Sequence, residues 1–164
     1  MKSFEHLTDL QPLVGQELGV SEWVSVEQQR IDQFADATGD HQWIHIDPVR
    51  AAAGPFKTTV AHGFLTLSLL GGFYEFYLQH ALPFCDRGLN YGLNKIRFTS
   101  LVRSGSRLRA RFVLAKVDEV DGGLQLTCNV TVEIEGQDKP ALIAESIVRR
   151  YLAKGTRSKW PHLA

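Results

Sequence analysis

The sequence contains few cysteines and no cluster of them. Among its 164 residues are only Cys85 and Cys128, which lie too far apart for a short metal-binding knuckle. Nothing in this pattern requires an oxidising compartment, so we interpret both as reduced core residues. A chain of this length, with 44% hydrophobic residues, can bury roughly 70% of its unfolded surface without metals or disulfides. We expect a single domain over residues 1–164, neither disulfide-stapled nor disordered.

The sequence also lacks net charge, an apolar leader and a membrane-like segment. Its 18 basic and 18 acidic side chains cancel, and without a recognisable binding motif this argues against a nucleic-acid partner. No apolar run follows Lys2, so no secretory signal is indicated and a cytoplasmic location is expected. The apolar stretch 60–77 is interrupted by Gly71-Gly72 and Glu75 and lacks basic flanks. These features favour a helix buried in protein over a membrane span.

Acidic residues are absent from one long segment although the total charge is zero. Residues 87–117 contain 8 basic side chains and no acidic ones, whereas residues 1–86 contain 4 basic and 11 acidic ones. Such a segment is typical of a surface that receives a phosphate-bearing ligand, or of strands with arginines on their solvent face. The sequence leaves both interpretations open.

A helix is predicted near residue 30. Ser25 and Gln28 have the spacing of a capping box, an imperfect apolar stripe follows them, and Gly39 is a typical stop. We therefore expect a helix over residues 26–38.

A loop and a second, shorter helix follow. Asp47 and Pro48 are typical of a capping residue and the first helical position, which predicts a single turn over residues 48–53. Residues 40–45 are confined by Gly39 and Pro48, so we expect a structured loop there rather than a long helix.

The C-terminal half reads as strands, over residues 91–98, 107–117, 124–135 and 141–152. The third alternates most regularly, with apolar Leu124, Leu126, Cys128, Val130, Val132 and Ile134 on one face. Turn sequences at 121–123 and 136–138 join consecutive strands, which indicates an antiparallel sheet. A sheet with one apolar face and a helix that is apolar all round predict an α+β fold in which the sheet wraps the helix.

Two motifs in the first half carry a family resemblance. The sequence ATGDHQWIHIDP, followed after a short helix by AHGFLTLSLL, resembles the MaoC-like dehydratases, and most closely their NodN-like branch. The resemblance covers about residues 15–152 and leaves a C-terminal tail, 153–164. It implies a hot-dog fold, an (R)-specific enoyl-CoA hydratase activity, and a homodimer with its sites at the subunit interface.

The resemblance also implies site residues. The catalytic Asp and His of the family fall on Asp40 and His45, and its oxyanion glycine falls on Gly63. The family has Asn two residues after the Asp, where this sequence has Gln42. Gln offers the same amide groups one methylene further out, so Gln42 is a candidate for positioning water.

The chemistry of these residues fits hydration of a trans-2-enoyl thioester. The reaction needs a base to take a proton from water and an acid to protonate the α-carbon, and Asp40 and His45 supply two titratable groups. An N–H of Gly63 at a helix start would stabilise the enolate charge. No metal or organic cofactor is required. The substrate would be an acyl group on CoA or acyl-carrier protein, with Lys95, Arg97 and Arg103 as candidates for holding CoA phosphates.

Other interpretations remain open. Asp40 could instead be an ordinary turn carboxylate and His45 a structural histidine. Gly63 could be present only because helices pack closely there. His62 is assigned no chemistry. A zinc site of His41, His45 and Asp47 is disfavoured because their spacing suits a helix and a loop is expected there. A thioesterase on the same fold, or an acyl-thioester-binding protein without turnover, are the alternative functions.

Overall fold

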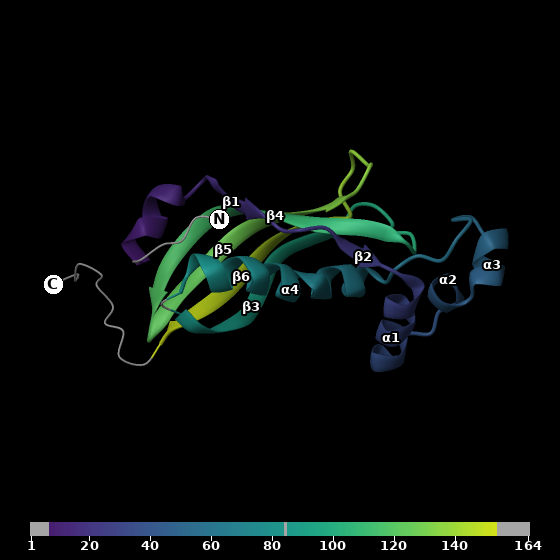
Figure 1. The fold of residues 1–164 in the computed structure, drawn as a ribbon, viewed down its shortest axis with the longest axis horizontal. Helices are drawn as coiled ribbons and strands as arrows, with labels where there is room; N and C mark the ends of the chain where they lie inside the picture. Colours follow the sequence, from purple (N-terminus) through teal and green to yellow (C-terminus); the bar gives the residue numbers. More distant parts are fainter. Residues whose placement is uncertain (1–6, 84, 154–164) are drawn as a thin grey trace.

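The computed structural model describes residues 7–83 and 85–153, and its main feature is a six-stranded antiparallel sheet (Figure 1). The strands are β1 (Glu17–Val20), β2 (Val24–Val26), β3 (Cys85–Phe98), β4 (Ser106–Val120), β5 (Gly123–Ile134) and β6 (Leu142–Leu152). Their order is β1-β4-β5-β6-β3, and β2 also pairs with β4. The four predicted strands are confirmed, and β1 and β2 are additional. Of the expected tail, residues 154–164 lie outside the described residues.

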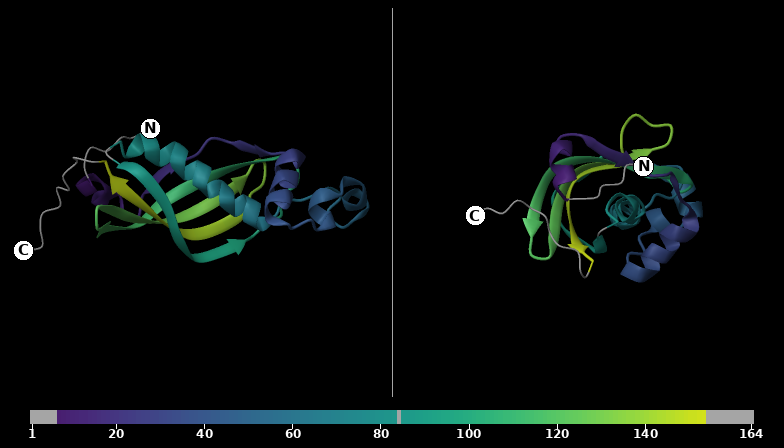
Figure 2. Two further views of the ribbon diagram at one scale, coloured as in Figure 1. Left: turned by 90° about the horizontal axis from the view of Figure 1, so that it is seen from below. Right: turned by 60° about the vertical axis from the view of Figure 1, so that its left-hand side comes forward.

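A long helix, α4 (Gly63–Ala81), lies across the concave face of the sheet (Figure 2). All the apolar positions predicted to face inward from β5 are buried, from Leu124 to Ile134. They join Leu65, Leu70 and Phe73 of α4 in one hydrophobic core. Burial of each such side chain contributes about 1.5–3 kcal/mol. The sheet therefore wraps the helix, as the sequence predicts. Within the described residues, no helix has the length and hydropathy that crossing a membrane requires.

Three short helices lie beyond one end of the sheet, beside the N-terminus of α4 (Figure 1). They are α1 (Gln28–Thr38), α2 (Trp43–Ile46) and α3 (Pro48–Ala53), and a 3-10 helix (Leu7–Leu13) precedes β1. The predicted stop of α1 is confirmed, because Gly39 has a φ of 77° and its N–H bonds the carbonyl of Ala35. The predicted cap of α3 is also confirmed, since the Asp47 side chain accepts from the N–H of Arg50 at 2.9 Å.

Two local predictions need correction. The capping box at Ser25 does not form, because Ser25 lies in β2 opposite Arg107 and the helix starts after Glu27, which makes no side-chain cap. The Gln28 side chain is instead engaged in long-range hydrogen bonds. The expected loop at 40–45 contains the start of α2, a single turn of helix.

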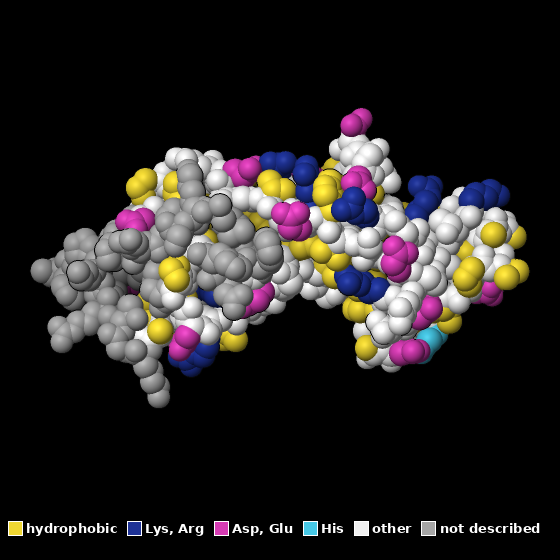
Figure 3. Space-filling view, viewed as in Figure 1, with side chains coloured by type: hydrophobic (Ala, Val, Ile, Leu, Met, Phe, Trp, Pro, Cys, Tyr) yellow, Lys and Arg dark blue, Asp and Glu magenta, His cyan; other side chains and the backbone are white. Residues whose placement is uncertain are grey.

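The arginines of β4 fit the solvent-face interpretation of the basic segment. Arg107 pairs with Glu135 at 2.9 Å and Arg109 with Glu133 at 2.5 Å, while Arg111 bonds Glu17 and Glu133. Figure 3 shows basic and acidic side chains intermixed on this side of the molecule. These arginines are balanced by acidic residues from neighbouring strands, so they do not form a free anion-binding surface.

Candidate active site

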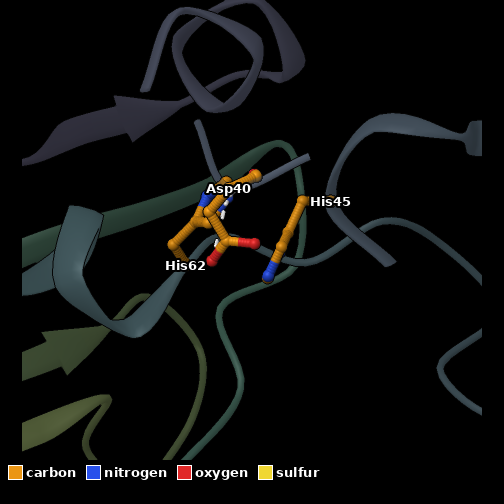
Figure 4. Close-up of side chains that lie close together, drawn as sticks. All are labelled: Asp40, His45 and His62. Carbon is orange, nitrogen blue, oxygen red and sulfur yellow. Dashed lines mark hydrogen bonds and ion pairs between the residues drawn. The ribbon is translucent and has the colours of Figure 1, made fainter. Parts of the chain in front are cut away.

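Three side chains from separate elements meet next to the N-terminus of α4 (Figure 4). Asp40 follows α1, His45 belongs to α2, and His62 precedes the first residue of α4. Each offers a carboxylate oxygen or ring nitrogen that lies within 4.8 Å of those of the other two. Gly39 makes this possible, because its left-handed conformation ends α1 and turns the chain so that Asp40 faces α2.

His45 is buried, and its protonation state follows from its contacts. Its side chain is 6% exposed, and Nδ1 lies 2.6 Å from the carbonyl oxygen of Val60. A carbonyl only accepts, so Nδ1 carries the hydrogen and Nε2 presents a lone pair. Burial lowers the pKa of His45 below its usual value, outweighing the hydrogen bond to Val60, which raises it. His45 is therefore a neutral imidazole with a free basic nitrogen at pH 7.

The backbone of His45 is held in place by Gln28 of α1. The Gln28 Nε2 donates to the carbonyl of His45 at 2.7 Å and to Asp32 Oδ1 at 2.8 Å. The Gln28 Oε1 accepts from the hydroxyl of Thr59, which is 2% exposed. Gln28 therefore ties α1, α2 and the segment before α4 together.

Asp40 faces both solvent and the two histidines. Its side chain is 58% exposed, and Oδ2 lies 3.9 Å from Nε2 of His62. The same His62 nitrogen donates to the main-chain oxygen of Asp40 at 2.9 Å. Figure 4 shows the Asp40 carboxylate pointing toward the ring end of His45. The Asp40 and His45 ligand atoms lie within 4.8 Å of each other, a separation that one water molecule with hydrogen bonds of about 2.8 Å to each can bridge.

Gly63 is the first residue of α4, where backbone N–H groups lack helical partners. Within the described residues no acceptor bonds its N–H. A Cβ at this position would lie 3.2 Å from the ring of Phe98, so close packing also favours glycine. Gln42 is the exposed N-terminal capping residue of α2, and its side chain makes no capping bond.

His62 is the residue that sequence reasoning missed. It is 3% exposed, and its ring stacks on that of His45, with 3.7 Å between centroids and 24° between planes. Its position next to Gly63 in the AHGF motif was the available signal. Contacts with residues 17 and 22 positions away are what give it importance, and no local pattern encodes them.

The disfavoured zinc set is not assembled. His41 bonds Asp36 at 2.9 Å and Asp47 caps α3, so neither shares a site with His45. The group Asp40, His45 and His62 is a closer cluster. However, ring nitrogens bind a metal in the ring plane at about 2 Å, and two stacked rings 3.7 Å apart do not aim at one point. The geometry favours proton transfer over metal binding.

The three predicted phosphate-binding residues occupy two places. Lys95 and Arg97 line an open groove of about 460 Å³ on the sheet, together with Glu145. Arg103 forms an isolated bridge with Val60, whose carbonyl bonds His45. Arg103 is therefore linked to the His45 site, whereas Lys95 and Arg97 belong to a separate surface.

Comparisons with known proteins identify the family of this chain. The family model "MaoC like domain" matches residues 9–135. The chain is 51% identical over 154 residues to 3-hydroxyacyl-thioester dehydratase Z of Mycobacterium tuberculosis, covering 91% of this chain and 98% of that protein. It is 50% identical over 143 residues to nodulation protein N of Rhizobium leguminosarum bv. viciae, covering 86% and 88%.

Solved structures share the fold of this chain. The (R)-hydratase from A. caviae involved in PHA biosynthesis superposes with a TM-score of 0.66 at 23% identity, covering 82% of this chain and 94% of that one. This likeness concerns the fold, which is the hot-dog arrangement of sheet and helix. The chain belongs to the MaoC-like dehydratase family, and the resemblance to its NodN-like branch is confirmed.

Proposed function

We propose that this protein is an (R)-specific enoyl-thioester hydratase that reversibly adds water to trans-2-enoyl thioesters. The observation that carries the proposal is the pairing of a neutral, buried His45 with the Asp40 carboxylate beside the unbonded N–H of Gly63. The relative named as a 3-hydroxyacyl-thioester dehydratase supports this reaction, run in the reverse direction.

The reaction can be followed atom by atom. A water held between Asp40 and His45 gives a proton to the pair while its oxygen bonds the β-carbon. The π electrons move toward the thioester carbonyl, and the resulting enolate oxygen is stabilised by the Gly63 N–H and the α4 dipole. The enolate then takes a proton at the α-carbon from the same pair, which returns to its starting state. Because Asp40 and His45 are close, they act as one acid–base unit.

The proposed substrate is an acyl group carried as a thioester by CoA or acyl-carrier protein. Phe64 and Phe98 are 69% and 45% exposed beside Gly63, with ring centroids 6.0 Å apart. They offer an apolar surface next to the proposed oxyanion site. We keep Arg103 as a candidate phosphate contact near this site, and Lys95 and Arg97 as candidates that require the groove on the sheet to receive the carrier.

We also propose a homodimer that covers β3. This strand ends the sheet and is exposed along nearly its whole length. Leu89, Tyr91 and Leu93 alternate along it and are 56%, 55% and 43% exposed. A long apolar edge strand is a site of unwanted association unless a defined partner covers it. A second copy supplies an identical edge, as in most symmetric oligomers.

Sedimentation equilibrium tests the dimer. We expect a dimer for the wild type and at least tenfold weaker association for Leu93→Asp, because the charge would be buried in the interface. Val49→Asp is the matched control, since Val49 is 85% exposed on α3. A monomeric wild type, or a Leu93→Asp variant that associates as tightly as the wild type, contradicts the proposal.

The activity is tested with crotonyl-CoA and longer trans-2-enoyl-CoAs. We expect the ultraviolet absorbance of the conjugated thioester to fall while the thioester stays intact, and chiral chromatography of the product to give the (R)-3-hydroxyacyl thioester. Release of free CoA would support a thioesterase. Thermal stabilisation by an acyl-CoA that stays unchanged would support a binding protein.

A further inference from the structure

His62 contacts every group that the proposed reaction uses. Its ring stacks on His45 at 3.7 Å, its Nε2 donates to the main-chain oxygen of Asp40 at 2.9 Å, and the next residue is Gly63. The ring of Phe34 in α1 lies near it, with 5.1 Å between centroids. His62 is therefore enclosed by α1, the Asp40 loop and α2, and no other described side chain is recorded in contact with both Asp40 and His45.

We propose that His62 is a positioning residue, which fixes Asp40 and the His45 ring in the geometry that a shared water needs. The proposal rests on the proposed hydratase function and deepens it. His62 acts through Asp40 and His45 and is not itself a proton donor to the substrate, since its Nε2 is engaged by the main-chain oxygen of Asp40 and its Nδ1 is buried.

The hydrogen bonding of His62 fits a residue that holds Asp40 in place better than it fits a residue that only fills the core. Because the Asp40 carbonyl accepts, Nε2 carries the hydrogen, and Nδ1 is buried without a partner among the described residues. A buried polar atom without a partner costs about 1–3 kcal/mol, which an apolar side chain of similar size would avoid. Packing alone therefore does not explain a histidine here. The Nε2–H that donates to the main-chain oxygen of Asp40 does explain it.

The ring stack also supports a neutral His45. The charged and titratable groups facing His45 are Asp40 from the loop and His62 from the start of α4, and the Val60 carbonyl holds its Nδ1. Asp40 and Val60 raise the pKa of His45, while burial and His62 lower it. Removing the His62 ring opens one face of His45 to water, so its pKa should move upward.

Two substitutions separate the two contacts. His62→Phe keeps a ring against His45 and loses the donor to Asp40, whereas His62→Gln keeps a donor near the Nε2 position and loses the ring. We expect kcat to fall about 10²-fold in His62→Phe, as for a misplaced catalytic group, and about tenfold in His62→Gln. KM should stay within about threefold in both, because His62 does not touch substrate.

His41→Gln is the matched control. His41 lies in the same loop, is exposed and bonds Asp36, and it contacts neither histidine of the site, so kcat should stay within about twofold. Unchanged kcat in folded His62→Phe and His62→Gln would reduce His62 to packing and overturn the proposal. Thermal unfolding of each variant establishes that it is folded. If His62→Phe does not fold, the kcat of His62→Gln alone tests the positioning role.

A titration of His45 tests the proposal without turnover. Its ring proton signals, followed by NMR against pH, should report a pKa that rises in His62→Gln, which removes the covering ring, rises less in His62→Phe, which keeps one, and stays unchanged in His41→Gln. An unchanged pKa of His45 in folded His62→Gln contradicts the role of the His62 ring in positioning His45. If the wild type hydrates no enoyl thioester, the proposed function fails, and this titration still tests the link between His62 and His45.

Discussion

Gln28→Met removes the hydrogen bonds that hold the backbone of His45 while preserving the length of the side chain. Gln28 donates to the carbonyl of His45 at 2.7 Å and accepts from the hydroxyl of Thr59. Thr59 is 2% exposed, so its hydroxyl would be left without an acceptor in a site closed to water. The carbonyl of His45 would lose its donor in the same step.

The expected loss of stability follows from these two groups. An orphaned buried polar group costs about 1–3 kcal/mol, so two that are partly buried should lower the free energy of unfolding by about 2–4 kcal/mol. For a chain of 164 residues each kcal/mol lowers Tm by about 2–4 °C, which predicts a decrease of about 4–16 °C. We also expect kcat to fall about tenfold, since α2 is no longer tied to α1.

Urea denaturation followed by fluorescence measures the change, with Thr59→Val and the double variant completing a cycle. Once Gln28 is gone, removing the Thr59 hydroxyl removes one orphan, so the double variant should recover about 1 kcal/mol relative to additivity. Gln16→Met is the control, because Gln16 makes an exposed bond to Pro12 and should change stability by less than about 0.5 kcal/mol. A Gln28→Met loss below about 0.5 kcal/mol with an additive cycle would refute the reasoning.

Three further predictions concern pH, packing and charge. Burial lowers the pKa of His45, so the unfolded chain binds a proton that the native one does not; stability should fall as pH drops below about 6.5, with a smaller slope in His45→Gln. The raised pKa of His41 acts in the opposite direction, so both proteins are compared in a His41→Gln background by urea denaturation. Gly123→Ala drives a Cβ into the carbonyl oxygen of Arg150 and to 3.0 Å from Tyr151 Cα, both in the backbone of β6, and should cost about 1–3 kcal/mol, whereas Gly72→Ala, with nothing within 4 Å, should cost nothing; equal Tm values would contradict this. Replacing Lys95, Arg97 and Arg103 by Ala should raise KM for acyl-CoA about fivefold and reduce its salt dependence with kcat unchanged, and an unaltered KM would return them to solvated surface.

The sequence predicts those parts of the fold whose pattern is local. The alternation from Leu124 to Ile134 identifies a strand with one buried face, and the apolar stretch at 60–77 identifies the central helix. The strands β1 and β2 have only 4 and 3 residues, too few for a period to show. They form because β4 offers them its free edge, a contact that spans about half of the chain.

The capping box was wrong for a related reason. Ser25 and Gln28 have the right spacing, but the sheet takes the backbone of Ser25 and distant partners take the side chain of Gln28. Long-range hydrogen bonds therefore override a local motif. For the site, the motif places Asp40, His45 and Gly63, and the structure brings them together at the start of α4. The motif assigns no role to His62 or Gln28, because their importance comes from contacts with residues far away in the sequence.

The most direct test of the account is the rate of enoyl-thioester hydration by Asp40→Asn, His45→Gln and the double variant. The account predicts that each single variant loses at least about 10³-fold in kcat/KM and that the double variant loses little more, because the two groups work as one acid–base unit. The Tm values of the folded variants should stay within a few degrees of that of the wild type. Substantial hydration by either single variant, or losses that multiply in the double variant, would contradict the shared role of Asp40 and His45.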